Sequence, residues 1–227
     1  MPFPMIHLHV ANKIATIHPE LIKSPSQFYL GTLSPDSVHM REEFIANEKK
    51  ITHLCTSDEN WGEITKNDEW IDNVMSFWHE HKNSDNSCFV LGYCVHILSD
   101  IYGNIHIWTP FKQKMNLEMK DYYGGAHHNR QASVDFKLAH EFARKKEIWD
   151  LLKKSKVVTI PGIVFEGDIE KQKYRILYEQ YEDITEDKRT IDETLYQNAL
   201  TQIENTTNFV LQTLGDVDMS WHADFRV

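Results

Sequence analysis

The amino-acid sequence predicts an all-α protein, a compact bundle of several helices around a metal cluster. Apolar residues recur at intervals of three and four along most of the chain, which is typical of amphipathic helices. The one β-branched run, at 156–165, is cut by Pro161-Gly162 and predicts only a short extended piece. The most apolar segment, 88–108, also carries potential metal ligands. We therefore expect the bundle to be organised around that segment.

Helices are predicted where this spacing continues between two turn signals. In chain order, the predicted helices cover residues 5–17, 28–33, 41–51, 67–82, 88–102, 129–152, 174–181 and 190–214.

Several of these boundaries depend on particular residues. A Ser cap, a Pro at the first position and a Gln at the third make the stretch 24–27 a capping box before the second helix. That helix is expected to end at Gly31 and the Ser34-Pro35 break. Gly103 is expected to end the helix that starts at Cys88.

Length and composition are those of one globular domain. The 227 residues are 41% hydrophobic and 26% charged, which allows a core without disulfides. The chain has no internal repeat and no linker rich in Pro, Gly or Ser. We expect a single all-helical metal-binding domain over residues 1–227.

Charge and cysteine content argue against several classes of protein. A formal net charge of −10 is unsuited to duplex nucleic acid, whose binding depends on many Lys and Arg contacts to phosphate. Three cysteines without a CxxC pair argue against a disulfide framework or a cysteine zinc knuckle. The first ten residues contain neither a basic segment nor a long apolar one. We expect no membrane insertion and a cytoplasmic location, whereas no pattern indicates an oligomeric state.

The helix that starts at Cys88 carries His96 and Asp100 four residues apart. At that spacing both side chains project from one face of a helix. A charge is seldom fully buried unless it is paired or coordinates a metal, so this pair on a core helix indicates a divalent cation. A core histidine hydrogen-bonded to the aspartate is the alternative for the pair alone. His106 follows closely enough to serve the same ion or a neighbouring one.

Short motifs in the first half of the chain resemble the zinc-dependent phospholipase C family. This family shares an all-helical fold and a three-zinc site with the fungal single-strand-specific nucleases. The strongest motif, GYCVHILSDIYGNIH, is similar to the family's run of a His, three residues, an Asp, five residues and a His. The others are HLHVANK, the stretch from Leu30-Gly31 to Pro35-Asp36, and Thr52-His53-Leu54.

The resemblance implies a site with two or three zinc ions. Asp100 would bridge two ions, and His106 would belong to a separate site that the next helix completes. Asp36 is the expected catalytic carboxylate, either as a ligand or as the group that takes a proton from water. The metal ligands implied by the resemblance are His7, Asp36, His53, His96, Asp100, His106, His128 and Asp135.

The resemblance also implies an enzyme, a hydrolase of phosphoester bonds that uses a metal-activated water. Choline-specific members of the family have aromatic residues where this chain has Ser37 and Lys50. We therefore expect a small soluble phosphoester as substrate. The alternative is a non-enzymatic or degenerate relative in which the metal only joins the helices. One observation favours this alternative. Members of the family use their processed amino terminus as a zinc ligand, and we expect no such ligand beside His7, so that the site would be incomplete.

Overall fold

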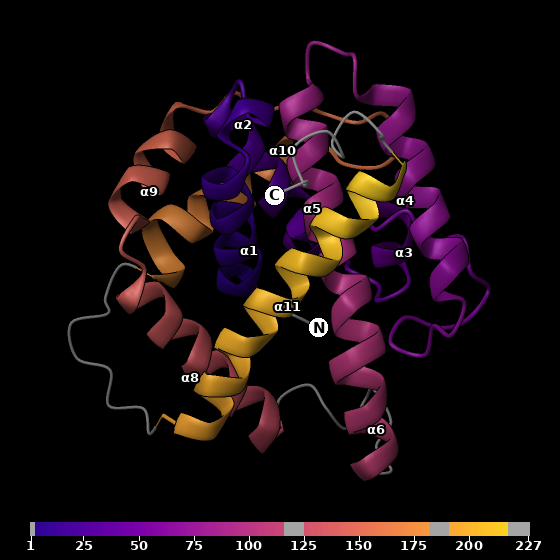
Figure 1. Ribbon diagram of the computed structural model, residues 1–227, viewed down its shortest axis with the longest axis vertical. Coiled ribbons are helices and arrows are strands. Elements are labelled where there is room, and N and C mark those ends of the chain that lie inside the picture. Colours follow the sequence, from indigo (N-terminus) through magenta and orange to yellow (C-terminus); the bar gives the residue numbers. More distant parts are fainter. Residues whose placement is uncertain (1–2, 116–124, 182–190, 218–227) are drawn as a thin grey trace, which may run out of the picture.

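Helix α5 (Ser87–Gly103) runs through the middle of the computed structural model, and four helices pack directly against it (Figure 1). These are α1 (Pro4–Ile17), α2 (Pro25–Leu33), α4 (Asn67–His81) and α11 (Glu193–Val217). Nearly every residue of α5 is buried. The apolar run predicted as the centre of the bundle therefore forms its central helix.

The structure describes residues 3–115, 125–181 and 191–217. Within these ranges the chain is helical apart from loops and one isolated bridge between Ile160 and Val164, so the all-α prediction is confirmed. One hydrophobic cluster of buried residues extends from α1 to α11. The remaining elements are η1 (Pro19–Leu21), η2 (Ser34–Met40), α3 (Glu48–Thr52), η3 (Asn104–Trp108), α6 (Thr109–Met115), α8 (Ala126–Glu141), α9 (Lys145–Lys154), α10 (Glu166–Arg175) and η4 (Ile176–Gln180).

Helices α2 and α5 cross with their backbones in contact, because each has a glycine at the crossing. A Cβ atom at Gly31 would lie 2.0 Å from the carbonyl oxygen of Phe89. A Cβ atom at Gly92 would lie 2.0 Å from the carbonyl oxygen of Phe28. Helix α2 ends at Leu33, before Ser34-Pro35 as predicted, but the prediction that Gly31 helps to end it was wrong, since Gly31 lies within the helix. This glycine is needed for close approach and does not terminate the helix.

The entry to α2 differs from the predicted capping box. Ser24 makes no side-chain cap hydrogen bond, although Pro25 does stand at the first helical position. The Ser24 backbone N–H instead donates to Cys88 Sγ at 3.3 Å. Gln27 donates to the carbonyl of Lys156 and accepts from its N–H, both at 3.0 Å. The Gln27 side chain thus joins α2 to the segment that follows α9 and leaves its own helix end uncapped.

The central helix does not end at Gly103. It continues through the π-helical turn η3 into α6, so that helical structure extends over 29 residues from Ser87 to Met115. By length and composition this helix could cross a membrane, but 89% of its most apolar window is buried within the protein. Glycine is tolerated here inside the helix, where it is buried with its neighbours.

Three other predicted helices have different bounds. The region 129–152 is two helices, α8 and α9, because Phe142 adopts an extended backbone and interrupts the run. Only the end of the region 41–51 is helical, as α3. The predicted helix 174–181 begins earlier, as α10, and passes into η4.

The last helix has a different cap from the one expected. The Asp192 carboxylate accepts the backbone N–H of Leu195 at 3.1 Å and so caps α11. Thr190, the predicted opening residue, lies outside the described residues. The helix also passes through Gly215 to Val217.

Replacing Gly31 with Ala should destabilise the protein strongly. The added methyl group meets the backbone of α5, which cannot move aside as a side chain can, so we expect a loss of about 3 kcal/mol or more in unfolding free energy. Denaturant unfolding followed by circular dichroism measures the loss. Gly167→Ala on α10 is the matched control: its Cβ would meet nothing within 4 Å, and the change should be neutral or stabilising by up to about 1 kcal/mol. Equal stability of the two variants would contradict this account of the crossing.

Candidate metal centre

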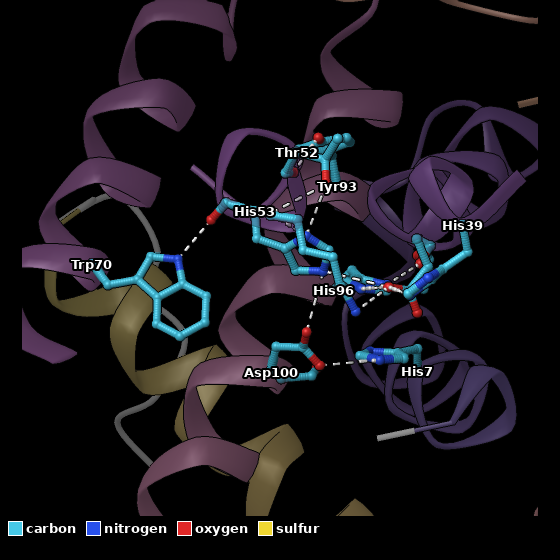
Figure 2. A network of polar contacts seen from close by, with 12 residues as sticks. His7, His39, Thr52, His53, Trp70, Tyr93, His96 and Asp100 are labelled. Carbon is cyan, nitrogen blue, oxygen red and sulfur yellow. Dashed lines mark hydrogen bonds and ion pairs between the residues drawn. The ribbon is translucent and has the colours of Figure 1, made fainter. Parts of the chain in front are cut away.

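Five of the predicted ligands meet at one place in the core. His7 comes from α1, Asp36 from η2, and His53 follows directly after α3. His96 and Asp100 both come from α5. Figure 2 shows the side chains of His7, His53, His96 and Asp100 directed toward one another. Four segments that are far apart in the sequence therefore supply one cluster.

The distances between the facing atoms are short. His53 Nε2 lies 3.2 Å from Asp100 Oδ2 and 3.5 Å from Asp36 Oδ1. His7 Nε2 lies 3.5 Å from Asp100 Oδ1, and His96 Nε2 lies 3.9 Å from Asp36 Oδ1. The rings of His7 and His96 are stacked, with centroids 3.7 Å apart. These atoms form two groups that could hold a metal ion, one of His7, His96 and Asp100 and one of Asp36, His53 and His96.

Two of the histidines are oriented by backbone carbonyls. His96 Nδ1 lies 2.7 Å from the carbonyl oxygen of Thr32, and His53 Nδ1 lies 2.9 Å from that of Lys49. Because a carbonyl oxygen only accepts, each Nδ1 must carry the proton and donate it. Burial and the neighbouring His7 hold the pKa of His96 well below its usual range, so this ring is neutral. Its Nε2 therefore presents a lone pair to the cluster, which is the form that binds metals.

The atoms that face one another in the cluster are nearly all acceptors. Among the described residues, His53 Nε2, His96 Nε2 and both oxygens of Asp100 make no hydrogen bond of ordinary geometry. Buried polar atoms without a partner are costly. A cation between them would satisfy these atoms at once, and imidazole nitrogen with carboxylate oxygen is a donor set that zinc accepts. The residues present thus fit a bound divalent metal ion.

Both carboxyl groups of the cluster are held in the ionised form. Burial raises the pKa of Asp36, but the Lys49 ammonium, 2.6 Å from its Oδ1, together with His39, His53 and His96, holds that pKa well below the usual range. Burial likewise raises the pKa of Asp100, and the facing His53 and His7 outweigh it. An ionised carboxylate is the form that binds a cation, so neither group needs to lose a proton first.

Aromatic side chains fix the segment that bears His53. The Trp70 indole N–H donates to the carbonyl of His53 at 2.6 Å, and the Tyr93 hydroxyl donates to the carbonyl of Thr52 (Figure 2). The next residue, Leu54, has a φ of 55°, a left-handed conformation that is uncommon for a branched side chain. The chain therefore turns sharply just after His53, and the hydrogen bonds from Trp70 and Tyr93 hold this turn in place.

The remaining three predicted ligands are not brought into either group. Because the helix continues past Gly103, His106 lies six residues beyond Asp100 on a different face, exposed and against Tyr102. His128 lies at the start of α8, with its ring 5.3 Å from that of Phe3.

Asp135 is buried, and its carboxyl group is engaged by other groups. One oxygen accepts the backbone N–H of Met5 at 2.9 Å, and the other accepts the Tyr181 hydroxyl. The carboxyl group thereby joins α1, α8 and the end of η4. The separate metal site expected from His106, His128 and Asp135 is thus not assembled.

Lys49 is the residue of the cluster that sequence reasoning missed. Its ammonium contacts Asp36, and its carbonyl orients His53. The one signal in the sequence is its position one helical turn before a predicted ligand. Lysines on helices are usually solvated, so this spacing alone did not indicate a buried role.

Comparisons of the chain with protein-family models, with curated protein sequences and with solved structures found no match. The resemblance to the zinc-dependent phospholipases therefore remains a prediction from short motifs.

Removing His96 should abolish most metal binding, because its Nε2 belongs to both groups of ligands. Losing a group that only orients a ligand already weakens metal binding about 10- to 100-fold, so we expect a larger loss for His96→Ala. Elemental analysis of protein purified without added metal measures the metal-to-chain ratio. His79→Ala, which removes an exposed histidine of α4, should keep the wild-type ratio. A His96→Ala variant with wild-type metal content would refute the assignment.

Asp135 should make stability depend on pH. Burial raises its pKa from an ordinary 3.8 to about 7, so between these values the folded protein keeps a proton that the unfolded chain releases. This contribution to stability is complete below pH 4 and is lost as the pH rises through 7. An asparagine has no such proton to release, so the Asp135→Asn variant does not lose this contribution. The melting temperature of the variant minus that of wild type should therefore increase between pH 4 and pH 7.5. Three pKa units set an upper limit of about 4 kcal/mol.

Asp150→Asn is the control for this measurement, because it removes a half-exposed carboxylate that pairs with Lys153 on the same helix. Its melting temperature relative to wild type should not change with pH. A flat pH dependence for Asp135→Asn as well would show that the buried carboxyl group does not titrate in this range.

Proposed function

We propose that this protein is a metal-dependent hydrolase of phosphoester bonds. The observation that carries the proposal is the convergence of three imidazoles and two ionised carboxylates on one buried point. The ligand order along the chain, which resembles that of the zinc-dependent phospholipases, supports the choice of reaction. Zinc is the proposed metal because the ligand atoms are nitrogen and carboxylate oxygen.

The residues can supply one complete ligand set and part of a second. His96 has a single ligand atom to offer, since Thr32 binds its Nδ1, so the two groups that share it cannot both be complete. His53, His96 and Asp100 would supply three ligands to one ion, and Asp36 is either the fourth ligand or the carboxylate that takes a proton from water. His7 and the other Asp100 oxygen remain for a second ion. Zinc bound in such a site lowers the pKa of water and polarises a phosphoryl oxygen.

Asp36 is the member of the cluster that solvent can reach. Its side chain is 15% exposed, whereas the other four ligands are at most 1% exposed. A substrate would therefore approach over η2. An ionised carboxylate at this opening can orient a water molecule and accept its proton. The apolar side chains of α5 exclude water from the opposite side.

Two positions support a substrate other than a choline phospholipid. Ser37 is fully buried and presents no aromatic surface. The Lys50 ammonium donates to the carbonyls of Ser57 and Glu59 at 2.9 and 3.0 Å, which directs it into a loop. These are the positions where choline-specific members of the phospholipase family have aromatic residues. A small soluble phosphoester suits the site better.

The burial of four ligands also supports a second function, a metal that only stabilises the fold. Structural sites are closed, and these ligands join α1, η2, α3 and α5 across most of the first half of the chain. The opening at Asp36 favours the enzyme. Catalysis measured on metal-loaded protein separates the two functions.

Zinc-loaded wild-type protein should hydrolyse an aryl phosphodiester or phosphomonoester faster than phosphatidylcholine in vesicles. Asp36→Asn should reduce kcat by about 100-fold or more, because proton transfer by a placed side chain contributes about 10²- to 10⁴-fold. Its zinc content should fall by a smaller factor. Release of the aryl alcohol is followed by absorbance, and the zinc content of each sample by elemental analysis.

Asp58→Asn is the matched control, since it removes a carboxylate that is 87% exposed. This variant should retain wild-type turnover. If fully loaded wild type hydrolyses neither aryl ester, or if Asp36→Asn is as fast as wild type, the hydrolase proposal fails and the structural metal takes its place.

A further inference from the structure

The set of potential metal ligands does not explain why the side chain of Lys49 is buried beside the cluster. The residue is only 4% exposed, yet its ammonium lies 2.6 Å from Asp36 Oδ1 and 5.0 Å from the centre of the Trp61 ring. Removing an ammonium from water is costly, and lysines are almost never fully buried without a specific partner. The carboxylate and the indole face hold this charge in a fixed place.

This charge lies on the side of the cluster that is nearest to solvent, although Asp36 Oδ1 itself is buried. The oxygen of Asp36 that it contacts also lies 3.6 Å from His39 Nε2, and the His39 side chain is 33% exposed. His53 and His96 lie on the inner side of the same oxygen and are closed to solvent. A ligand that enters past His39 and the exposed part of Asp36 would therefore meet Lys49 before it reaches the two histidines.

A site that held only a cation would have no use for this ammonium. A fixed positive charge beside a metal ligand repels the metal ion and competes with it for the carboxylate. The same charge favours an anion, since an ammonium carries three hydrogen-bond donors and no acceptor. Reactions of phosphoesters are favoured by fixed positive charge where negative charge develops on the phosphoryl oxygens. A buried lysine at this point thus indicates an anionic ligand.

We propose that Lys49 binds an anionic oxygen of the phosphoester at the side of the cluster that is nearest to solvent. This inference rests on the proposed function and names the group that recognises the phosphoryl part of the substrate. It also separates the roles of two adjacent lysines, because Lys50 is directed into the loop that contains Ser57 and Glu59.

The experiment measures binding of inorganic phosphate to zinc-loaded protein by calorimetry, together with zinc content by elemental analysis. The variants are Lys49→Met and Lys49→Gln, the second of which keeps a polar group beside Asp36. Loss of a hydrogen bond to a charged group should weaken phosphate binding about 10- to 100-fold in both variants. Zinc content should not fall below the wild-type ratio, because Lys49 offers no ligand atom to the ion and its charge competes with the ion for Asp36.

Lys66→Met is the matched control, since it removes the same charge from a side chain that is 51% exposed and pairs with Asp58. This control should bind phosphate as wild type does. Phosphate binding within about twofold of wild type in both Lys49 variants, at equal zinc content, overturns the role of Lys49 and leaves the hydrolase proposal intact. Loss of zinc or of folding in both variants overturns it too and assigns Lys49 to the structure of the cluster. Wild-type protein that binds no zinc overturns both proposals.

Discussion

The backbone contact between α2 and α5 is the constraint on which the rest of the structure depends. Gly31 and Gly92 allow the two helices to approach until a carbonyl of each fills the space of a side chain on the other. That approach brings the carbonyl of Thr32, next to Gly31, within 2.7 Å of His96 Nδ1. The crossing therefore sets both the packing of the core and the direction in which the His96 ring points.

Sequence reasoning identified the five residues of the cluster and the helix at its centre. It succeeded with His96 and Asp100 because a carboxylate that shares one face of an apolar helix with an imidazole needs a charged partner in the core. It assigned Gly31 to a helix end because local rules do not reveal where another helix will cross. The hydrogen bonds of Asp135 were not foreseen for a similar reason, since its partners Met5 and Tyr181 are distant in sequence.

Lys49 shows a different limit of sequence reasoning. Its spacing from His53 is visible, but burial of an ammonium depends on what surrounds it in three dimensions. Here Asp36 and Trp61 provide that environment from separate segments. Burial disfavours a charge, whereas a neighbouring opposite charge favours it. Only the assembled cluster shows which of these two effects is larger. The presence of the Lys49 ammonium beside the carboxylates of Asp36 and Asp100 distinguishes this cluster from a set of side chains that only binds metal.

The depth of the cluster also has a kinetic consequence. His7, His53, His96 and Asp100 are closed to solvent, and Asp36, the partly exposed member of the cluster, lies on η2. A cation held by these residues would leave only when that short segment opens, an event of local unfolding. Residence time would then depend on the mobility of residues 34–53 as well as on the strength of the individual ligand bonds. The same segment, held by Trp70 and Tyr93, would act as the gate for exchange with the surrounding solution.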